Sequence, residues 1–133
     1  MIGVDTNVLV RFLVQDDAGQ GALARDLLVT CTEEDPAFVS REAVVELVWV
    51  LESAYRFPRG KVSDALDGLL SAEEIVVDAA ESMALALERY RNEGADFADQ
   101  MIALAGQGVG CRATYTFDRR AARFPEMSLI TSA

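Results

Sequence analysis

Acidic side chains that could bind a metal ion occur at several separated places in the chain. Asp5 ends an apolar run at the N-terminus, and Asp118 directly follows a second run at residues 113–117. Asp96 and Asp99 stand three residues apart at the start of a predicted helix, so they lie on roughly one face of it. Gathered carboxylates repel one another and raise each other's pKa, and a divalent cation removes that repulsion. Ligation by oxygen alone favours Mg²⁺ or Mn²⁺, which can activate water to hydrolyse a phosphodiester.

A further acidic pair, Glu42 and Glu46, shares one face of the helix predicted over residues 41–55. Glu42 lies in the first turn, where it could compensate the helix dipole. Glu46 stands among apolar residues in a helix that is apolar nearly all round, so we expect it to be buried and to need a partner. Arg41 or Arg11 could be that partner without any catalytic role. The segment is therefore consistent with either a metal ligand or a structural ion pair.

Each aspartate also has a purely structural alternative. We expect Asp5 to lie in the interior, but it could instead cap a helix that begins at Thr6. Asp96 is a good N-cap, and Asp99 would then stand in the first turn, where the helix dipole favours an anion. Asp118 could cap the turn formed by the RRAAR segment that follows it. Together these alternatives explain less, because no histidine or lysine stands near these acids in the sequence to neutralise them.

The composition excludes several classes of enzyme. The chain has no histidine, which excludes Ser-His-Asp and Cys-His catalysis, ribonucleases that use an imidazole base, and histidine-containing zinc sites. The two cysteines, Cys31 and Cys111, are too far apart in sequence to form a metal motif, so we expect reduced, buried thiols in a cytoplasmic protein. Lys61 is the single lysine. Any catalysis must therefore rely on carboxylates, hydroxyls, amides and arginine.

The charge is strongly acidic, with 22 acids against 12 bases and a net charge of −10. This balance argues against broad, non-specific binding of nucleic acids, but it leaves open a bound cation or a basic partner protein. Residues 111–133 reverse the balance, with four arginines against two acids. These arginines are candidates for phosphate contact or, equally, for an ordinary solvated face with salt bridges: Arg112, Arg119, Arg120 and Arg123. No segment has the apolar length of a membrane span, and the N-terminus lacks the pattern of a signal peptide.

The predicted elements alternate between strands and helices. Strands are expected at residues 1–5, 37–39, 74–77 and 113–117, with a possible fifth at 128–131. Helices are expected at residues 6–14, 19–30, 41–55, 58–70, 79–91 and 97–105. This alternation predicts an α/β fold with a central, mainly parallel sheet of four to five short strands, covered on both faces, in a single domain over residues 1–133. If the first and fourth strands are adjacent, Asp5 and Asp118 meet at the ligand-binding edge of the sheet.

Four motifs, taken in order, resemble a known family. They are DTN at residues 5–7, VVELVWVL at 44–51, ADFADQMIALA at 95–105 and TYTFDRRAARF at 114–124. Each is weak alone, but their order and spacing resemble the PIN-domain ribonucleases, specifically the VapC-type toxins of toxin–antitoxin pairs. The resemblance spans nearly the whole chain.

The resemblance implies a three-layer α/β/α fold and an RNA endonuclease that depends on Mg²⁺ or Mn²⁺. It also implies a homodimer that is inhibited by a small VapB-type antitoxin. The implied metal-binding and catalytic residues are Asp5, Glu46, Asp99 and Asp118, with Asp96 as an accessory ligand. The residues that would orient these ligands and their waters are Thr6, Asn7 and Thr116.

Two alternatives belong to other functional classes. A phosphatase that uses Asp5 as a covalent nucleophile usually begins with D-x-D and has a well-placed lysine, whereas position 7 here is asparagine. A non-catalytic binding module could keep the fold and a structural metal, although the complete set of acids argues against it. A trapped aspartyl-phosphate would identify the phosphatase, and a nuclease assay would separate the enzyme from the binding module.

Overall fold

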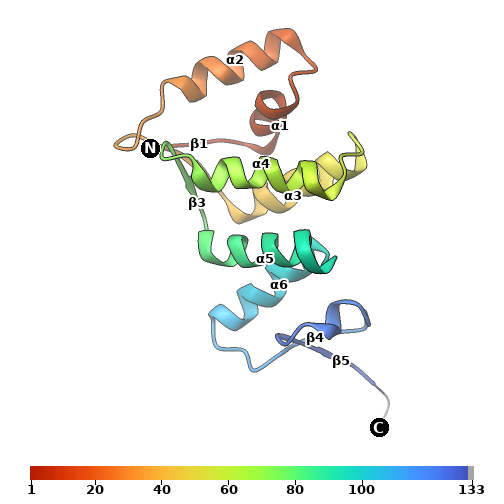
Figure 1. Ribbon diagram of the computed structural model, residues 1–133. Helices are drawn as coiled ribbons and strands as arrows, with labels where there is room; N and C mark the ends of the chain where they lie inside the picture. The colour runs from red at the N-terminus through yellow and green to blue at the C-terminus, as the bar shows by residue number, and fades with distance from the viewer. Residues whose placement is uncertain (132–133) are drawn as a thin grey trace. The chain divides into compact units, whose positions relative to one another are not determined.

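The computed structural model describes residues 1–131 of the chain, and the last two residues of the predicted domain lie outside this range. The chain divides into two compact units, Met1–Ala80 and Glu81–Ala133 (Figure 1). Every predicted helix and strand is present, and all strand pairings are parallel. The predicted α/β class is therefore confirmed. The single domain over residues 1–133 stays a prediction.

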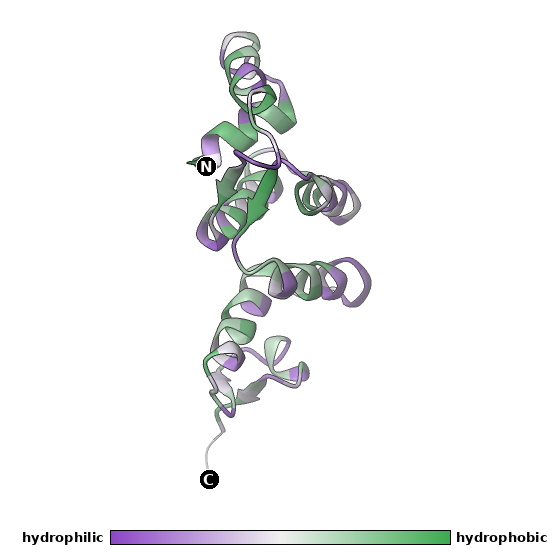
Figure 2. Cartoon of the chain, turned by 90° about the vertical axis from the view of Figure 1, so that its left-hand side faces the viewer, coloured by the Kyte–Doolittle hydropathy of each residue, from purple (hydrophilic) through white to green (hydrophobic). Residues whose placement is uncertain are grey.

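The first unit contains a three-stranded parallel sheet with the strand order β1-β2-β3. Its strands are β1 (Ile2–Gly3), β2 (Ala37–Val39) and β3 (Ile75–Val77). Its helices are α1 (Thr6–Val14), α2 (Ala18–Val29), α3 (Arg41–Ser53) and α4 (Arg59–Ser71). Ile2 is in register with Ala37, and Ala37 with Ile75. The strands β2 and β3 contain only hydrophobic residues and lie toward the hydrophobic end of the colour scale in Figure 2, whereas the helices carry both hydrophobic and hydrophilic residues.

Helix α3 shows how local sequence sets the position of the candidate site. Ser40, whose residue type favours the N-cap position, caps it: its hydroxyl accepts a hydrogen bond of 3.1 Å from the Ala43 amide. One face of the helix is buried, formed by Ala43, Val44, Leu47, Val48 and Leu51. The other face is open, since Trp49 is 65% exposed and both Glu42 and Glu46 are exposed. The helix was expected to be apolar nearly all round, but only one of its faces is buried, so that expectation was wrong.

The second unit contains the remaining helices and a two-stranded parallel sheet. Its elements are α5 (Ala80–Glu93), α6 (Phe97–Gly108), β4 (Thr114–Thr116), a short 3-10 helix η1 (Ala121–Arg123) and β5 (Met127–Leu129). Tyr90 of α5 meets Phe97 of α6 edge to face, with ring centroids 6.3 Å apart. Thr114 is in register with Met127. The five strands are thus paired within two sheets, and the adjacency of the first and fourth strands stays a prediction.

Two further expectations concern the surface. Both cysteines are free, but Cys111 is exposed and Cys31 is only half-buried, so the expectation of buried thiols was wrong. Cys111 follows the positive-φ turn at Gly110, just after α6. Within residues 1–131, no helix has the length and apolar character needed to cross a membrane.

Candidate active site

A pocket of about 320 Å³ in the first unit brings two of the predicted acids together. Asp5 and Glu46 both line it, from the N-terminus of α1 and from α3. The rest of its wall consists of Thr6, Asn7, Val10, Arg11, Val50, Ala54 and Tyr55. Since Asn7 and Arg11 are four residues apart on α1, they share one face of that helix. Glu46, Val50 and Ala54 follow the same spacing along α3 and its C-cap, so one stripe from each helix forms the pocket.

Asp5 has the structural role that the sequence offered as an alternative. It is the N-cap of α1, and its Oδ1 accepts a hydrogen bond of 2.7 Å from the Thr6 amide. Its side chain is exposed, although its neighbours Val4 and Thr6 are buried, so the expectation of an interior carboxylate was wrong. Because the cap uses only Oδ1, Oδ2 can still bind a ligand in the pocket.

Glu46 is exposed on the open face of α3, which corrects the expectation that it is buried. Neither predicted arginine partner pairs with it. Arg41 binds Asp78 with contacts of 2.9 and 3.4 Å, and Arg11 binds Asp16 at 3.1 Å. A carboxylate with an exposed side chain keeps its hydration and needs no ion pair. Glu46 therefore faces the pocket as an acceptor, while Glu42 on the same helix is not part of the pocket wall.

Two acids at the start of α6 form the predicted cap arrangement. Asp96 is the N-cap, and its Oδ1 accepts a hydrogen bond of 3.0 Å from the Asp99 amide. Asp99 is half-buried in the first turn. Its pKa is raised, first by burial and then by the negative charges of Asp96 and Asp118. This shift indicates a carboxylate whose charge lacks compensation.

Asp118 caps the turn after β4, which confirms its structural alternative. Its Oδ1 accepts hydrogen bonds from the amides of Arg120 at 2.8 Å and Ala121 at 3.2 Å. Its own amide donates to the Thr116 hydroxyl at 3.0 Å. Thr116 thus orients the loop that carries Asp118. As with Asp5, one carboxylate oxygen makes the cap contacts and the other is open.

The predicted acids are divided between the two units. Asp5 and Glu46 belong to the first unit, whereas Asp96, Asp99 and Asp118 belong to the second. Within residues 1–131, no three carboxylate or thiol side chains are placed to hold a metal ion. The convergence of the acids on one site stays a prediction. Their chemistry fits a hard cation, because all donors are oxygens and because Asp99 carries uncompensated repulsion.

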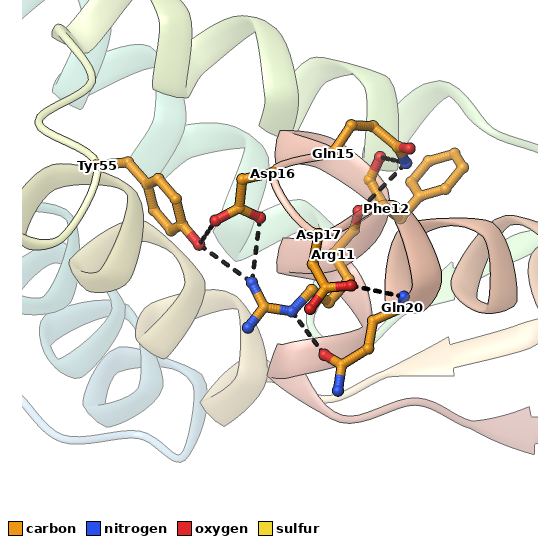
Figure 3. A network of polar contacts seen from close by, with 7 residues as sticks. All are labelled: Arg11, Phe12, Gln15, Asp16, Asp17, Gln20 and Tyr55. Atoms are coloured by element: carbon orange, nitrogen blue, oxygen red, sulfur yellow. Dashed lines mark hydrogen bonds and ion pairs between the residues drawn. The ribbon is translucent and has the colours of Figure 1, made fainter.

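A polar network beside the pocket was not expected from the sequence (Figure 3). Arg11 donates from Nη1 to Asp16 at 3.1 Å and to the Tyr55 hydroxyl at 3.3 Å, and from Nε to Gln20 at 2.7 Å. The Tyr55 hydroxyl donates in turn to Asp16 at 2.8 Å. Because Asn7 and Arg11 are four residues apart, the sequence could have placed Arg11 on the same helix face as Asn7. The contact between Arg11 and Tyr55, however, spans 44 residues of sequence. Periodicity in a single helix does not reveal such a contact.

The candidate phosphate-binding arginines differ from one another. Arg123 donates to the Glu93 carbonyl oxygen and stacks on Phe124 at 4.7 Å, so it has a structural role. Arg112, Arg119 and Arg120 are exposed. These three side chains are therefore the better candidates for contact with a ligand.

Comparison with known proteins places this geometry in a family context. A family model described as PIN domain matches residues 2–127. The chain is also similar to a VapC ribonuclease of Aquifex aeolicus (strain VF5), with 23% identity over 117 residues that cover 88% of this chain and 87% of that protein. No solved structure gives a significant match.

Proposed function

Since the chain belongs to the PIN domain family, we propose that it is a VapC-type endoribonuclease and the toxin of a toxin–antitoxin pair. The observation that carries the proposal is the extent of the family match. Residues 2–127 include both units and every acid in the proposed site. The similarity to a VapC ribonuclease over most of both chains supports the same assignment.

The proposed site binds Mg²⁺ or Mn²⁺ through Asp5, Glu46, Asp99 and Asp118, with Asp96 as an accessory. A bound ion of this kind supplies a water of lowered pKa and positive charge beside the phosphate oxygens. The protein's own part is to hold the carboxylates in place. The caps at Asp5 and Asp118 each fix one oxygen and leave the other open, which favours ligation.

Neighbouring polar residues orient the site. Thr6 and Asn7 extend the pocket wall beside Asp5, and the Thr116 hydroxyl holds the main chain at Asp118. We assign contact with RNA phosphates to the exposed arginines Arg112 and Arg119, together with Arg120. Arg123 contributes less, because its guanidinium already binds a main-chain carbonyl.

The partner that we propose is a small, basic VapB-type antitoxin, and the protein acts as a cytoplasmic homodimer. A net charge of −10 favours a positively charged partner segment, and an arginine of that segment could pair with the carboxylates in place of the metal. Co-expression of the antitoxin should relieve toxicity, and the affinity of the complex should fall as salt rises. A salt-insensitive, apolar interface would contradict the charge argument while leaving the toxin assignment in place.

The test of the function is a cleavage assay with antitoxin-free protein. RNA should be cut in Mg²⁺ or Mn²⁺ and left intact in EDTA, and Asp5→Asn should abolish cutting while keeping the cap. Asp17→Asn is the matched control, because Asp17 also caps a helix through a contact of 2.9 Å to the Gln20 amide but lies outside the proposed site. Cutting that persists in EDTA would refute the metal mechanism. Hydrolysis of a phosphate monoester through a trapped aspartyl-phosphate would favour a phosphatase instead.

A further inference from the structure

The pocket in the first unit has a cationic wall as well as an acidic one. Asp5 and Glu46 supply carboxylates, and Arg11 supplies the positive charge in the wall. Arg11 stands six positions after Asp5, the N-cap of α1, which corresponds to about 9 Å along the helix axis. This separation is of the order of one nucleotide step. An extended polynucleotide with one phosphate beside the carboxylates would therefore bring a neighbouring phosphate close to Arg11.

The guanidinium of Arg11 is held by three acceptors from different segments. Nε donates to Gln20 of α2, while Nη1 donates to Asp16 in the preceding loop and to Tyr55 after α3. Nη2 takes part in none of these hydrogen bonds. Figure 3 shows this nitrogen turned away from Asp16 and Gln20. Nε and Nη1 are thus held by protein acceptors, and Nη2 remains as a donor for a ligand.

Stability alone does not explain this arrangement. The side chains of Arg11 and Asp16 are 31% and 41% exposed, and ion pairs at that exposure contribute little to stability. Tyr55 contributes a hydroxyl that bonds to both members of the pair. These contacts hold the long, flexible side chain of Arg11 in one position. Arginine ordered in this way loses less entropy when its Nη2 binds a phosphate oxygen.

We propose that Arg11 binds the RNA phosphate adjacent to the one that is cut, and that Asp16 and Tyr55 are positioning residues that hold its guanidinium. The proposal rests on the ribonuclease function proposed above. Because Asp16 offsets the charge of Arg11, the contact depends on hydrogen-bond geometry as well as on charge. Lysine has no planar guanidinium for Gln20, Asp16 and Tyr55 to hold in one orientation, so it should replace Arg11 poorly.

The test uses a labelled RNA that the wild-type protein cuts and, for binding, the uncut oligodeoxynucleotide of the same sequence. Single-turnover cleavage is measured over a range of protein concentrations at saturating Mg²⁺. Arg11→Met should raise the concentration for half-maximal rate by about ten- to a hundredfold, the range for a charge-assisted hydrogen bond, with little change in the maximal rate. Arg11→Lys should show a smaller rise. Tyr55→Phe should raise this concentration several-fold.

The salt dependence of binding distinguishes a phosphate contact from a structural role. Loss of one contact should reduce the slope of log K against log[salt] by about 0.7 in Arg11→Met, whereas Arg11→Lys should keep the wild-type slope. Arg25→Met is the control, because Arg25 is an exposed arginine of the same unit that bonds to Gln15 and does not line the pocket. Its slope and its half-maximal concentration should match the wild type.

The outcomes separate the two proposals. If the wild-type protein cuts RNA and Arg11→Met leaves both half-maximal concentration and salt slope unchanged, the role of Arg11 is refuted and the nuclease function stands. A fall in maximal rate alone would place Arg11 at the reacting phosphate and overturn the assignment to its neighbour. If the wild-type protein does not cut RNA, the proposed function fails, and the salt slope with the oligodeoxynucleotide still decides whether Arg11 contacts a phosphate.

Discussion

The two units each contain an arginine that binds a carboxylate and a glutamine, but the two clusters differ in burial. In the first unit Arg11 and Asp16 are 31% and 41% exposed and lie beside a pocket. In the second unit the side chains of Arg89 and Glu126 are only 12% and 8% exposed. An arginine–carboxylate pair is therefore partly open to solvent in the first unit and largely shielded from it in the second. Burial decides whether such a pair holds the fold together or remains available to a ligand.

The geometry of the buried pair fits a role in folding. Arg89 forms a fork with Glu126, with contacts of 2.8 Å from Nη1 and 3.0 Å from Nη2, and it also donates to Gln100 at 2.8 Å. The pair joins α5 to the segment before β5, and the hydrogen bond to Gln100 adds α6. The pKa of Glu126 is lowered, first by the hydrogen bond from Arg89. A guanidinium whose two terminal nitrogens are both bound within the protein has little left to offer a substrate.

The largest effect expected from this comparison is on stability. Arg89→Met should lower the free energy of unfolding by about 3–5 kcal/mol, because it leaves the buried carboxylate of Glu126 without a partner. Arg11→Met removes a pair of the same kind at the surface and should cost much less stability than Arg89→Met. Urea unfolding followed by circular dichroism measures both. Equal losses for the two variants would show that burial does not distinguish the clusters.

Glu46 and Glu42 of α3 test whether activity depends on the pocket in the first unit. Glu46→Gln should reduce cleavage at least about a hundredfold, which corresponds to about 2.7 kcal/mol of barrier. Glu42→Gln should stay near the wild-type rate, because Glu42 is exposed but not part of the pocket wall. Both changes remove one exposed charge from the same helix. Activity that is lost in Glu42→Gln and kept in Glu46→Gln would move the site to another face of α3.

The aspartates of α6 offer the same contrast in the second unit. Asp99→Asn should also reduce cleavage about a hundredfold or more. Asp96→Asn keeps the cap on α6, so it should have an intermediate effect and act mainly on metal affinity. Rates measured at increasing Mn²⁺ concentration separate these cases. Rescue of Asp99→Asn by high Mn²⁺, with none for Asp96→Asn, would exchange the roles of the two residues.

A bound cation should stabilise the folded protein by a similar amount. A ligand that binds only the folded state at a hundredfold excess over its Kd contributes about 2.7 kcal/mol. The Tm should therefore rise with Mn²⁺ in the wild type, and Asp5→Asn should flatten that rise. Asp17→Asn is the matched cap control and should respond as the wild type does. An identical response in Asp5→Asn would place the cation elsewhere.

Local sequence predicted the elements and caps well, because those features depend on neighbouring residues. Ser40, Asp5, Asp96 and Asp118 all act as caps, and each bonds to an amide within three residues. Burial was harder to predict. Glu46 was expected inside because its sequence neighbours are apolar, but the buried residues of α3 fall on one face and Glu46 falls on the other.

The polar clusters could not be predicted at all, because their partners are distant in sequence. Arg89 and Glu126 are separated by 37 residues, and Arg11 and Tyr55 by 44. A single sequence gives the periodicity of each helix but not the rotation of one helix against another. The same limit applies to the candidate site. The acids could be named from their motifs, whereas the part played by the Arg11 network depends on tertiary contacts.

The smallest effects concern the pH dependence of stability. The pKa of Glu126 in the folded protein lies below its ordinary value of 4.5, so the folded state binds fewer protons than the unfolded state in that range. The stability contributed by Glu126 is therefore fully present above its unfolded pKa and is lost as the pH falls through its folded pKa.

Glu126→Gln should consequently be less stable than the wild type at pH 7, and the difference between them should shrink as the pH falls below about 4.5. The pKa of Asp16 is also lowered, first by the hydrogen bond from Tyr55, but this pair is exposed, so Asp16→Asn should leave the stability curve nearly unchanged. Urea unfolding between pH 7 and pH 3 measures all three proteins, and the comparison with wild type cancels the titration of the other acids. Parallel curves for Glu126→Gln and wild type would mean that the buried pair contributes no pH-dependent stability. A convergence seen for Asp16→Asn instead would reverse the roles assigned to the two clusters, since the exposed pair would then be the one that supports the fold.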